Sequence, residues 1–442
     1  MTAITTAAGL SGPPDGVVTL VEGTTFCISG RAGDLCPGAA QGLFHRDARI
    51  LSTWQIRVQG TVPQPVTVLS EEPFQATFIS RVRVGDEQTE LLLERTRSVA
   101  DGMREELRLR NLGRRAVRTT LQIRADADFA DLFAVKEGEP QLSGLTSTHP
   151  RKSWLDIYSE ENGTRRGVRI AAEGAVAHRE GLHFEVSIPP GGQWRSSVII
   201  SASVQGEATP EAFAWPPAAP TPVLPSRCGS APRLETVSAE LGPILARSLE
   251  DLRALRVVDP VDPAVSAVVA GAPWFMALFG RDALLSSYMA LPLDGSLLVG
   301  ALRVLARHQG TRVNPPTEEE PGRILHETRL GTSFPLTRGG GRVYYGTVDA
   351  TPLFVMMVGE LMKALLRLDP RPAARELRFD PVWPPAYGPL AIHNLRLGPD
   401  RVSLRVDPAE QGPARAQLSG VAQDVRVIRA ARPPLTRLPG AG

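Results

Sequence analysis

The segment WFMALFGRD, residues 274–282, ends in an Arg-Asp pair and runs directly into an apolar stretch at 283–293 that is typical of a helix. Two further polar clusters follow, GRILHETR at 322–329 and YYGTVDATP at 344–352. Each of the three segments carries arginine, aspartate, glutamate, histidine or tyrosine, and apolar helical runs separate them. The pattern predicts a polar pocket on a helical scaffold, which suits a sugar better than an apolar metabolite.

The helical scaffold is predicted from the spacing of apolar residues. From residue 234 onward, leucine, isoleucine and valine recur every three or four positions over two dozen residues, which indicates one face of a helix. Residues 282–290, 297–308 and 348–368 predict further helices. Short alternating segments follow at 390–397, 401–406 and 425–429, and these predict a small C-terminal β segment over 376–432.

The first part of the chain, residues 16–204, has a different period. Apolar and polar residues alternate over 54–59, 90–96 and 105–112, and Asp101-Gly102 is a hairpin signal between the last two segments. About ten to twelve short strands at regular spacing predict an antiparallel β-sandwich. Prolines crowd residues 205–232, which predict a linker, and the helical domain is expected over 233–368.

Composition narrows the class of protein. The 442 residues carry 49 basic and 47 acidic side chains, a formal net charge of +2, which gives no reason to expect nucleic acid or a membrane surface as partner. The first twenty residues lack the pattern of a signal peptide, and the three cysteines show no metal-binding spacing. Cys27 and Cys36 could pair, although free thiols fit a cytoplasmic protein better. We therefore expect a cytoplasmic protein without metal or cofactor.

Several of these motifs resemble a known family. LFHRDARILS at 43–52 resembles a signature in the N-terminal domain of bacterial glycogen debranching enzyme-like proteins. Residues 273–276 with 279–282, then 308–310, 319–327 and 344–354, resemble the amylo-α-1,6-glucosidase-like helical domain of the same proteins. The resemblance covers about 16–362 and about 376–407, with five motifs in the same order.

The resemblance implies an (α/α)6 toroid in which Arg281 and Asp282 hold the hydroxyls of a terminal glucose. A guanidinium and a carboxylate can match vicinal hydroxyls. The structural alternative is a salt bridge at the start of the following helix, where Asp282 would interact with the helix dipole. His45-Arg46-Asp47, in the predicted sandwich, is interpreted as a polar network or a domain contact rather than a catalytic site.

The remaining candidate residues also have two interpretations each. His326 and Glu327 form either a ligand-binding, acid/base pair or a structural hydrogen-bond pair at a helix start. Tyr345 and Asp349 are expected to line the same cleft, although Asp349 is also a candidate N-cap for a helix that begins at Ala350. Trp274 is a candidate for stacking on a sugar, with burial in the core as the alternative.

The chain departs from the family pattern in length. A twelve-helix toroid needs roughly 250 to 350 residues, whereas the helical stretch here holds about 135. The resemblance places the catalytic acid in a Trp-Lys-Asp-Ser-like loop of the second half, and this sequence contains no such loop. Inverting glycosidases need two carboxyl groups about 6.5–9.5 Å apart, and Glu327 and Asp349 are the local candidates.

The sequence therefore predicts a partial toroid and a glycogen debranching enzyme-like protein with impaired α-1,6-glucosidase chemistry. The alternative is a non-catalytic protein that binds an α-glucan or oligosaccharide, or one with a partner-dependent structural role. An incomplete toroid would expose apolar helix faces, which a second copy of the chain could cover.

Overall fold

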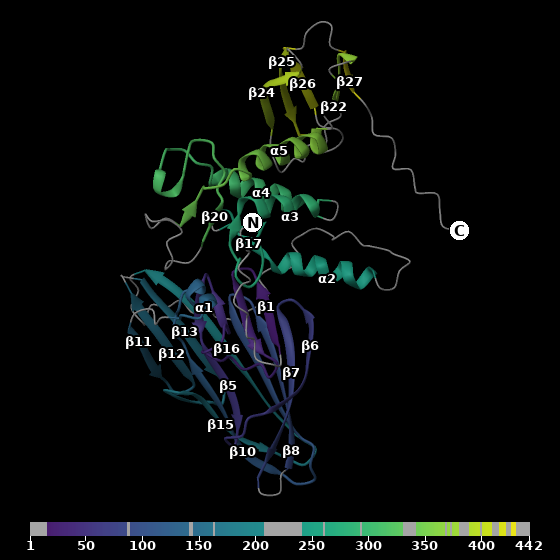
Figure 1. Ribbon diagram of the computed structural model, residues 1–442. Coiled ribbons are helices and arrows are strands. Elements are labelled where there is room, and N and C mark those ends of the chain that lie inside the picture. Colours follow the sequence, from purple (N-terminus) through teal and green to yellow (C-terminus); the bar gives the residue numbers. More distant parts are fainter. Residues whose placement is uncertain are drawn as a thin grey trace, which may run out of the picture. The chain divides into compact units, whose positions relative to one another are not determined.

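The computed structural model describes residues 16–85, 89–140, 145–161, 164–206, 241–259, 261–291, 294–329, 342–366, 369–371, 374–379, 389–397, 400–408, 415–420 and 426–429 (Figure 1). The chain divides into two compact units, Met1–Ala350 and Thr351–Gly442. The boundary falls inside the segment 233–368 that was predicted as one helical domain. Most of the predicted linker at 205–232 lies outside the described residues.

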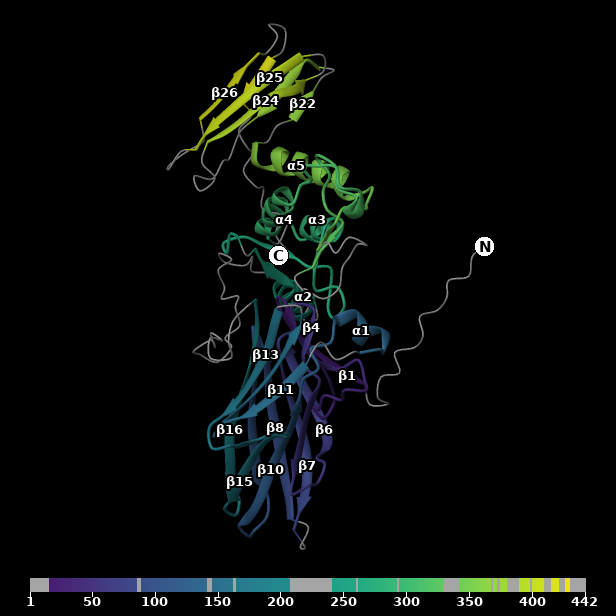
Figure 2. The ribbon, with the colours of Figure 1, turned by 90° about the vertical axis from the view of Figure 1, so that its left-hand side faces the viewer.

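The first unit contains the predicted antiparallel β-sandwich (Figures 1 and 2). Its large sheet has the order β11-β12-β13-β16-β9-β8-β7-β6 and faces a smaller sheet of order β14-β15-β10-β5. The strands of the large sheet are β6 (Gln64–Glu72), β7 (Gln75–Val84), β8 (Thr89–Val99), β9 (Gly102–Asn111), β11 (Leu145–Pro150), β12 (Trp154–Glu161), β13 (Thr164–Ala172) and β16 (Gln193–Gly206). Those of the smaller sheet are β5 (Thr53–Val58), β10 (Val117–Asp126), β14 (Val176–His178) and β15 (Gly181–Ile188).

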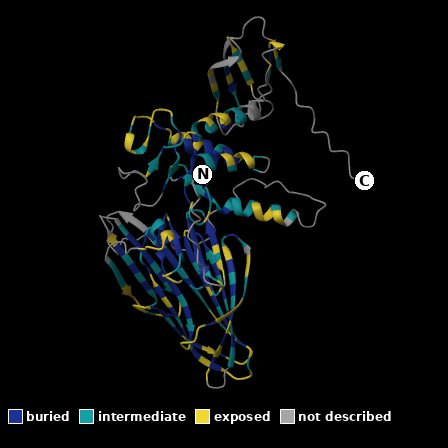
Figure 3. Cartoon of the chain, viewed as in Figure 1, coloured by how far each residue is buried: buried dark blue, intermediate teal, exposed yellow. Residues whose placement is uncertain are grey.

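Alternating burial along the strands explains the sandwich. In β10, buried and more exposed residues alternate from Val117 to Asp126, so that Leu121 and Ile123 enter the core while Arg118 and Arg124 face outward. Figure 3 shows the same alternation across both sheets. The hairpin signal at Asp101-Gly102 lies between β8 and β9, which pair in antiparallel register as the sequence predicts.

A buried ionic network crosses this core. The Glu105 carboxylate accepts hydrogen bonds from Nε of Arg95 and Nε of Arg97, both at 2.7 Å, and from Nε1 of Trp54 at 3.2 Å. Arg95 also reaches the Asp34 carboxylate at 2.6 Å. Burial alone would raise the pKa of Glu105, but the two arginine charges and their hydrogen bonds hold it below its ordinary value. The network joins β8, β9, β5 and the loop after β2.

A third sheet, of order β1-β2-β3-β4, extends the sandwich and carries the LFHRDARILS motif. Its strands are β1 (Val17–Glu22), β2 (Thr25–Gly30), β3 (Gly42–His45) and β4 (Ala48–Leu51). Arg46 and Asp47 make the turn between β3 and β4 with φ of 48° and 63°. The buried His45 shares a hydrogen bond of 2.8 Å between its Nδ1 and Oγ1 of Thr25. Burial, with a smaller contribution from the charge of Arg46, lowers the pKa of His45 to about 3.

Helices follow in the rest of the first unit, near the predicted positions. These are α2 (Leu241–Ala254), α3 (Gly280–Met289) and α4 (Gly295–Arg307), and the short α1 (Leu132–Glu137) precedes β11. Short strands between the helices were not predicted: β17 (Arg256–Val258), β18 (Ser266–Val268), β19 (Leu278–Phe279), β20 (Glu327–Thr328) and β21 (Val343–Tyr344). Two or three residues are too few for a period-2 pattern to be visible. Among the described residues, none of the helices is both long and apolar enough for a membrane span.

The second unit begins with most of α5 (Ala350–Leu366) and continues in β structure. One sheet has the order β22-β23-β27, from Asp369–Arg371, Glu376–Phe379 and Arg426–Arg429. The other has the order β24-β25-β26, from Leu390–Leu397, Asp400–Asp407 and Arg415–Ser419. The C-terminal strands predicted at 390–397, 401–406 and 425–429 correspond to β24, β25 and β27.

The buried network generates a stability prediction. Glu105→Gln leaves two buried guanidinium groups opposite a neutral amide, so we expect a loss of about 3–5 kcal/mol in the free energy of unfolding. The matched control is Glu106→Gln, because Glu106 is exposed and pairs with Arg104 on the surface; its effect should stay within about 1 kcal/mol. Urea unfolding monitored by circular dichroism measures both, and equal midpoints would contradict the prediction.

His45 generates a pH prediction. Its pKa is about 3 when folded and about 6.5 when unfolded, so the unfolded chain binds more protons between these values. The free energy of unfolding should therefore fall as the pH drops below 6.5, by about 2–3 kcal/mol at pH 4.5 from this group alone. His45→Gln should lose this part of the pH dependence, whereas the exposed control His149→Gln should keep it. Parallel pH profiles for wild type and His45→Gln would refute the assignment.

Candidate functional site

The polar segments of the sequence meet in a small sheet of order β19-β20-β21. Glu327 on β20 lies opposite Phe279 on β19 and opposite Tyr344 on β21. Helix α3 begins at Gly280, directly after β19. A Cβ atom at Gly280 would lie 2.2 Å from the carbonyl oxygen of Leu325, so only glycine permits this close approach. The sheet therefore brings Arg281, in the first turn of α3, near the ends of the other two segments.

Arg281 forms ion pairs with two carboxylates. Its Nη1 atom lies 2.9 Å from Oδ2 of Asp349, and its Nη2 atom lies 3.5 Å from Oδ2 of Asp282. The exposed fractions of the three side chains are 42% for Arg281, 37% for Asp349 and 35% for Asp282, so solvent reaches all of them. A hydrogen bond from Thr347, together with the one from Arg281, lowers the pKa of Asp349. Both aspartates therefore offer acceptor oxygens beside one planar donor group.

The positions of Asp282 and Asp349 also fit the structural roles that the sequence left open, because both lie at the start of a helix. Asp282 lies in the first turn of α3, where a negative charge interacts favourably with the helix dipole. Asp349 directly precedes α5. Sugar contact by Arg281 and Asp282 stays a prediction beside these structural roles.

Glu327 lies in a more buried part of the site. Its carboxylate is 3.5 Å from Nη2 of Arg329, and Nη1 of Arg329 is 3.6 Å from the carboxylate of Asp47. The exposed fractions are 14% for the Glu327 side chain, 4% for Arg329 and 7% for Asp47. Burial raises the pKa of Glu327, and the charge of Arg329 opposes part of this rise. Glu327 thus holds a proton more readily than an ordinary glutamate, whereas Asp349 holds one less readily.

Arg329 connects the sandwich to this site. Its guanidinium carbon lies 4.6 Å from the centre of the Phe133 ring and 5.7 Å from that of Phe279. The same group donates to the carbonyl oxygen of Trp274 at 3.4 Å. Asp47, predicted to form a polar network or a domain contact, does so through Arg329. Arg329 itself was not singled out as a candidate in the sequence, because the short strand β20 that precedes it was not predicted.

The other candidate side chains make packing contacts. The His326 ring lies edge-on to Phe279 at 5.7 Å and to Tyr344 at 5.8 Å. The hydroxyl of Tyr345 donates to the carbonyl of His308 at 2.8 Å, and Tyr345 is only 7% exposed. Trp274 meets Phe44 edge-on at 6.2 Å and packs against the core. The packing of Trp274 agrees with its structural interpretation, whereas Glu327 lies on strand β20 and not at the helix start that was expected for His326 and Glu327. Ligand contact by His326, Tyr345 or Trp274 stays a prediction.

Thr347 is a further polar residue of the site that sequence reasoning missed. It carries no distinctive pattern, and only its hydrogen bond to Asp349 reveals its role. Within the part of the chain that the structure describes, no group of three or more histidine, cysteine, aspartate or glutamate side chains has a metal-binding arrangement. Cys27 and Cys36 are both unpaired thiols.

Comparison with solved structures gives only distant likenesses. A putative kojibiose phosphorylase from the human microbiome shares 5% identity at a TM-score of 0.30, over 42% of this chain and 30% of the phosphorylase. A galactose mutarotase-like protein from Clostridium acetobutylicum shares 6% identity at 0.26, over 43% of this chain and 95% of that protein. A galactose mutarotase-like protein from Lactobacillus casei shares 8% identity at a TM-score of 0.26, over 42% of this chain and 100% of that protein. At these scores the likenesses carry no functional information.

The comparison with protein families gives a direct result. No curated protein matches the chain, but residues 20–198 match the family model of the N-terminal domain of (some) glycogen debranching enzymes. The match contains the LFHRDARILS motif at 43–52 and nearly the whole β-sandwich. The resemblance seen in the sequence is therefore confirmed for this part of the chain: residues 20–198 match the model of the N-terminal domain of (some) glycogen debranching enzymes, and the resemblance of the later motifs to a helical domain stays a prediction.

Proposed function

We propose that this chain is a glycogen debranching enzyme-like protein of α-glucan metabolism, homologous to α-1,6-glucosidase-type glycoside hydrolases but impaired in hydrolysis. The family of the N-terminal domain supports the link to glycogen. The observation that carries the proposal is the Arg281 cluster, in which one exposed guanidinium is held between Asp282 and Asp349.

The cluster suits a sugar for a physical reason. Vicinal hydroxyls of a glucose unit present a donor and an acceptor side by side, and a guanidinium next to a carboxylate presents the complementary pair. Because Asp349 is held by both Thr347 and Arg281, its orientation is set before a ligand arrives. Such preorganisation lowers the entropic cost of binding.

Hydrolysis would require distinct roles for the carboxyl groups of Glu327 and Asp349. Glycoside hydrolysis needs one protonated and one ionised carboxyl group, and environments that push two pKa values apart assign these roles. Here Glu327 has the raised pKa and Asp349 the lowered one, so Glu327 would serve as the acid and Asp349 as the base. We propose that residues 233–368 are derived from a partial (α/α)6 toroid, and that the absent acid loop of the second half limits this chemistry.

The alternative is a non-catalytic protein that binds an α-glucan. It is favoured by the pairing of each candidate carboxylate with an arginine: Asp282 and Asp349 with Arg281, and Glu327 with Arg329. A carboxylate engaged by an arginine is suited to bind hydroxyls but is a poorer proton carrier.

The proposal also concerns the location of the protein and its self-association. A cytoplasmic protein without cofactor fits the composition. Leu285, Tyr288 and Met289 of α3 are 39%, 41% and 79% exposed, and a second copy of the chain would cover such apolar side chains in a homo-oligomer that completes the toroid.

Binding to the Arg281 cluster can be measured by calorimetry. Isomaltotriose or maltotriose is titrated into wild type and Asp282→Ala, and we expect at least tenfold weaker binding, about 1.4 kcal/mol, for the variant. The control is Asp251→Ala, which removes an exposed aspartate that also pairs with an arginine, Arg247, on a helix. Equal affinities for wild type and Asp282→Ala would exclude the cluster as the sugar site.

Hydrolysis is tested separately by glucose release from isomaltotriose. If hydrolysis is impaired as proposed, wild type and Glu327→Gln should release glucose at rates within about twofold of each other. Matching thermal unfolding curves would show that the variant is folded. Rapid release by wild type that Glu327→Gln abolishes would establish an active enzyme and overturn the proposed impairment.

A further inference from the structure

The large sheet has an opening where one of its strands ends early. Strand β16 pairs with β9 from Gln193 to Ser201, but with β13 only from Val198 onward, because β13 ends at Ala172. The chain then turns at Glu173 and Gly174 and continues as β14 in the smaller sheet. In the described residues, the 193–197 segment of β16 therefore has a strand neighbour on one side only.

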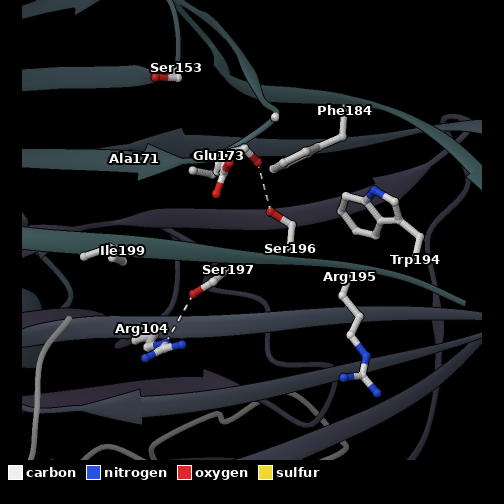
Figure 4. A pocket seen from close by; sticks show the side chains of 12 residues that line it. Arg104, Ser153, Ala171, Glu173, Phe184, Trp194, Arg195, Ser196, Ser197 and Ile199 are labelled. Atoms are coloured by element: carbon white, nitrogen blue, oxygen red, sulfur yellow. Dashed lines mark hydrogen bonds between the residues drawn. The ribbon is translucent and has the colours of Figure 1, made fainter. Parts of the chain in front are cut away.

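A cavity of about 740 Å³ fills this opening, here called the β16 notch. It is lined by Arg104, Ser153, Ala171, Ala172, Glu173, Gly174, Phe184, Trp194, Arg195, Ser196, Ser197 and Ile199 (Figure 4). Its volume lies within the range of about 300–1,000 Å³ that is usual for small-molecule sites. The notch is thus large enough for a ligand of several rings.

Aromatic rings and polar groups meet in the notch. Trp194 lies edge-on to Phe184 with ring centres 5.2 Å apart, and Figure 4 shows the two rings close together. The hydroxyl of Ser196 donates to the backbone carbonyl of Glu173 at 3.4 Å, which holds the crossover from β13 against β16. Nε of Arg104 donates to the hydroxyl of Ser197 at 3.2 Å. Because successive residues of a strand point to opposite faces, Trp194 lies toward the core with Phe184, whereas Arg195 and Ser197 lie on the other face of β16 with Arg104 (Figure 4). A ligand that contacts both sets of side chains therefore passes across the open edge of β16, where an aromatic surface and polar groups together suit a sugar.

Arg195 is the side chain of the notch with free donors. It is exposed, and its guanidinium forms no hydrogen bond or ion pair with any of the described residues. An arginine fork offers five N–H donors in one plane, which suits the paired oxygens of a sugar ring. Arg104, by contrast, is engaged by Ser197 and by Glu106 at 2.8 Å.

The notch continues along the outer face of the sheet. A second cavity of about 390 Å³ shares Arg195, Ser196 and Ser197 with it, and is otherwise lined by Glu94, Thr96, Glu106, Leu107 and Arg108. The two cavities together carry equal numbers of arginine and glutamate side chains, so a neutral ligand fits better than a charged one. Their continuity favours an elongated ligand over a single ring.

We infer that the β16 notch binds a linear gluco-oligosaccharide chain, with Trp194 as the apolar surface and Arg195 as the main hydroxyl-binding group. The choice of an α-glucan rests on the proposed function. The notch lies on the sandwich and shares no residue with the Arg281 cluster. It would therefore bind a long glucan independently of the proposed contact between Arg281 and a terminal glucose.

The test is a calorimetric titration of maltoheptaose into the full chain and its variants. Arg195→Ala is expected to bind at least fivefold more weakly, and Trp194→Phe to weaken binding in the same direction. Arg83→Ala is the matched control, because Arg83 is an exposed arginine on β7 of the same sheet, outside both cavities. Since Arg195 is exposed, its removal should leave the thermal unfolding curve unchanged.

The outcomes separate the two sites. Weaker binding by Arg195→Ala, with further loss when Asp282→Ala is added, supports the notch beside the proposed function. Wild-type affinity in Arg195→Ala together with lost binding in Asp282→Ala overturns the notch and leaves the proposed function intact. Weakening by Arg195→Ala but not by Asp282→Ala supports the notch and removes the Arg281 cluster. No binding of maltoheptaose by wild type would overturn both.

Discussion

The ion pairs of Arg329 are the interaction on which the candidate site depends. A buried guanidinium is costly unless its charge is compensated and its donors are used. Here Asp47 from the sandwich and Glu327 from β20 supply the charge, and the rings of Phe133 and Phe279 enclose the group. One partner comes from the β3–β4 turn of the sandwich and the other from the segment after α4. The ion pairs of Arg329 therefore fix the position of this segment relative to the sandwich.

The electrostatic surroundings of the two candidate carboxyl groups, Glu327 and Asp349, differ. Glu327 is enclosed, and burial raises its pKa, whereas Asp349 is open to solvent and its pKa is lowered by Thr347 and Arg281. Both groups pair with arginine, which favours recognition of hydroxyls over proton transfer. The proposed balance of this chain, with binding retained and hydrolysis impaired, follows from that pairing together with the missing acid loop.

The sandwich contains two further features, a buried ion-pair network and the β16 notch. Its interior contains an ion-pair network around Glu105, which restricts β8 and β9 to one register, since a shift would leave a buried charge unpaired. Within the same large sheet, the early end of β13 opens the β16 notch. The sandwich, which matches the model of the N-terminal domain of glycogen debranching enzymes, thus has an ion-paired core and, in its large sheet, the notch that we infer to bind a glucan.

The sequence by itself determined the antiparallel sandwich, the positions of helices α3 and α4, the C-terminal strands and the resemblance of residues 20–198 to the N-terminal domain of glycogen debranching enzymes. These follow from local periodicity, turn residues and motif order, which are properties of short segments. It also identified Arg281, Asp282, Glu327 and Asp349 as candidates. Only the tertiary structure decided that Arg281 pairs with two aspartates and that Arg329 joins Asp47 to Glu327. It also decided that β13 leaves the 193–197 segment of β16 without a neighbouring strand on that side. The pairs of Arg281 with Asp349 and of Arg329 with Asp47 join residues far apart in the chain, and no local pattern encodes which distant partner a charged side chain will meet.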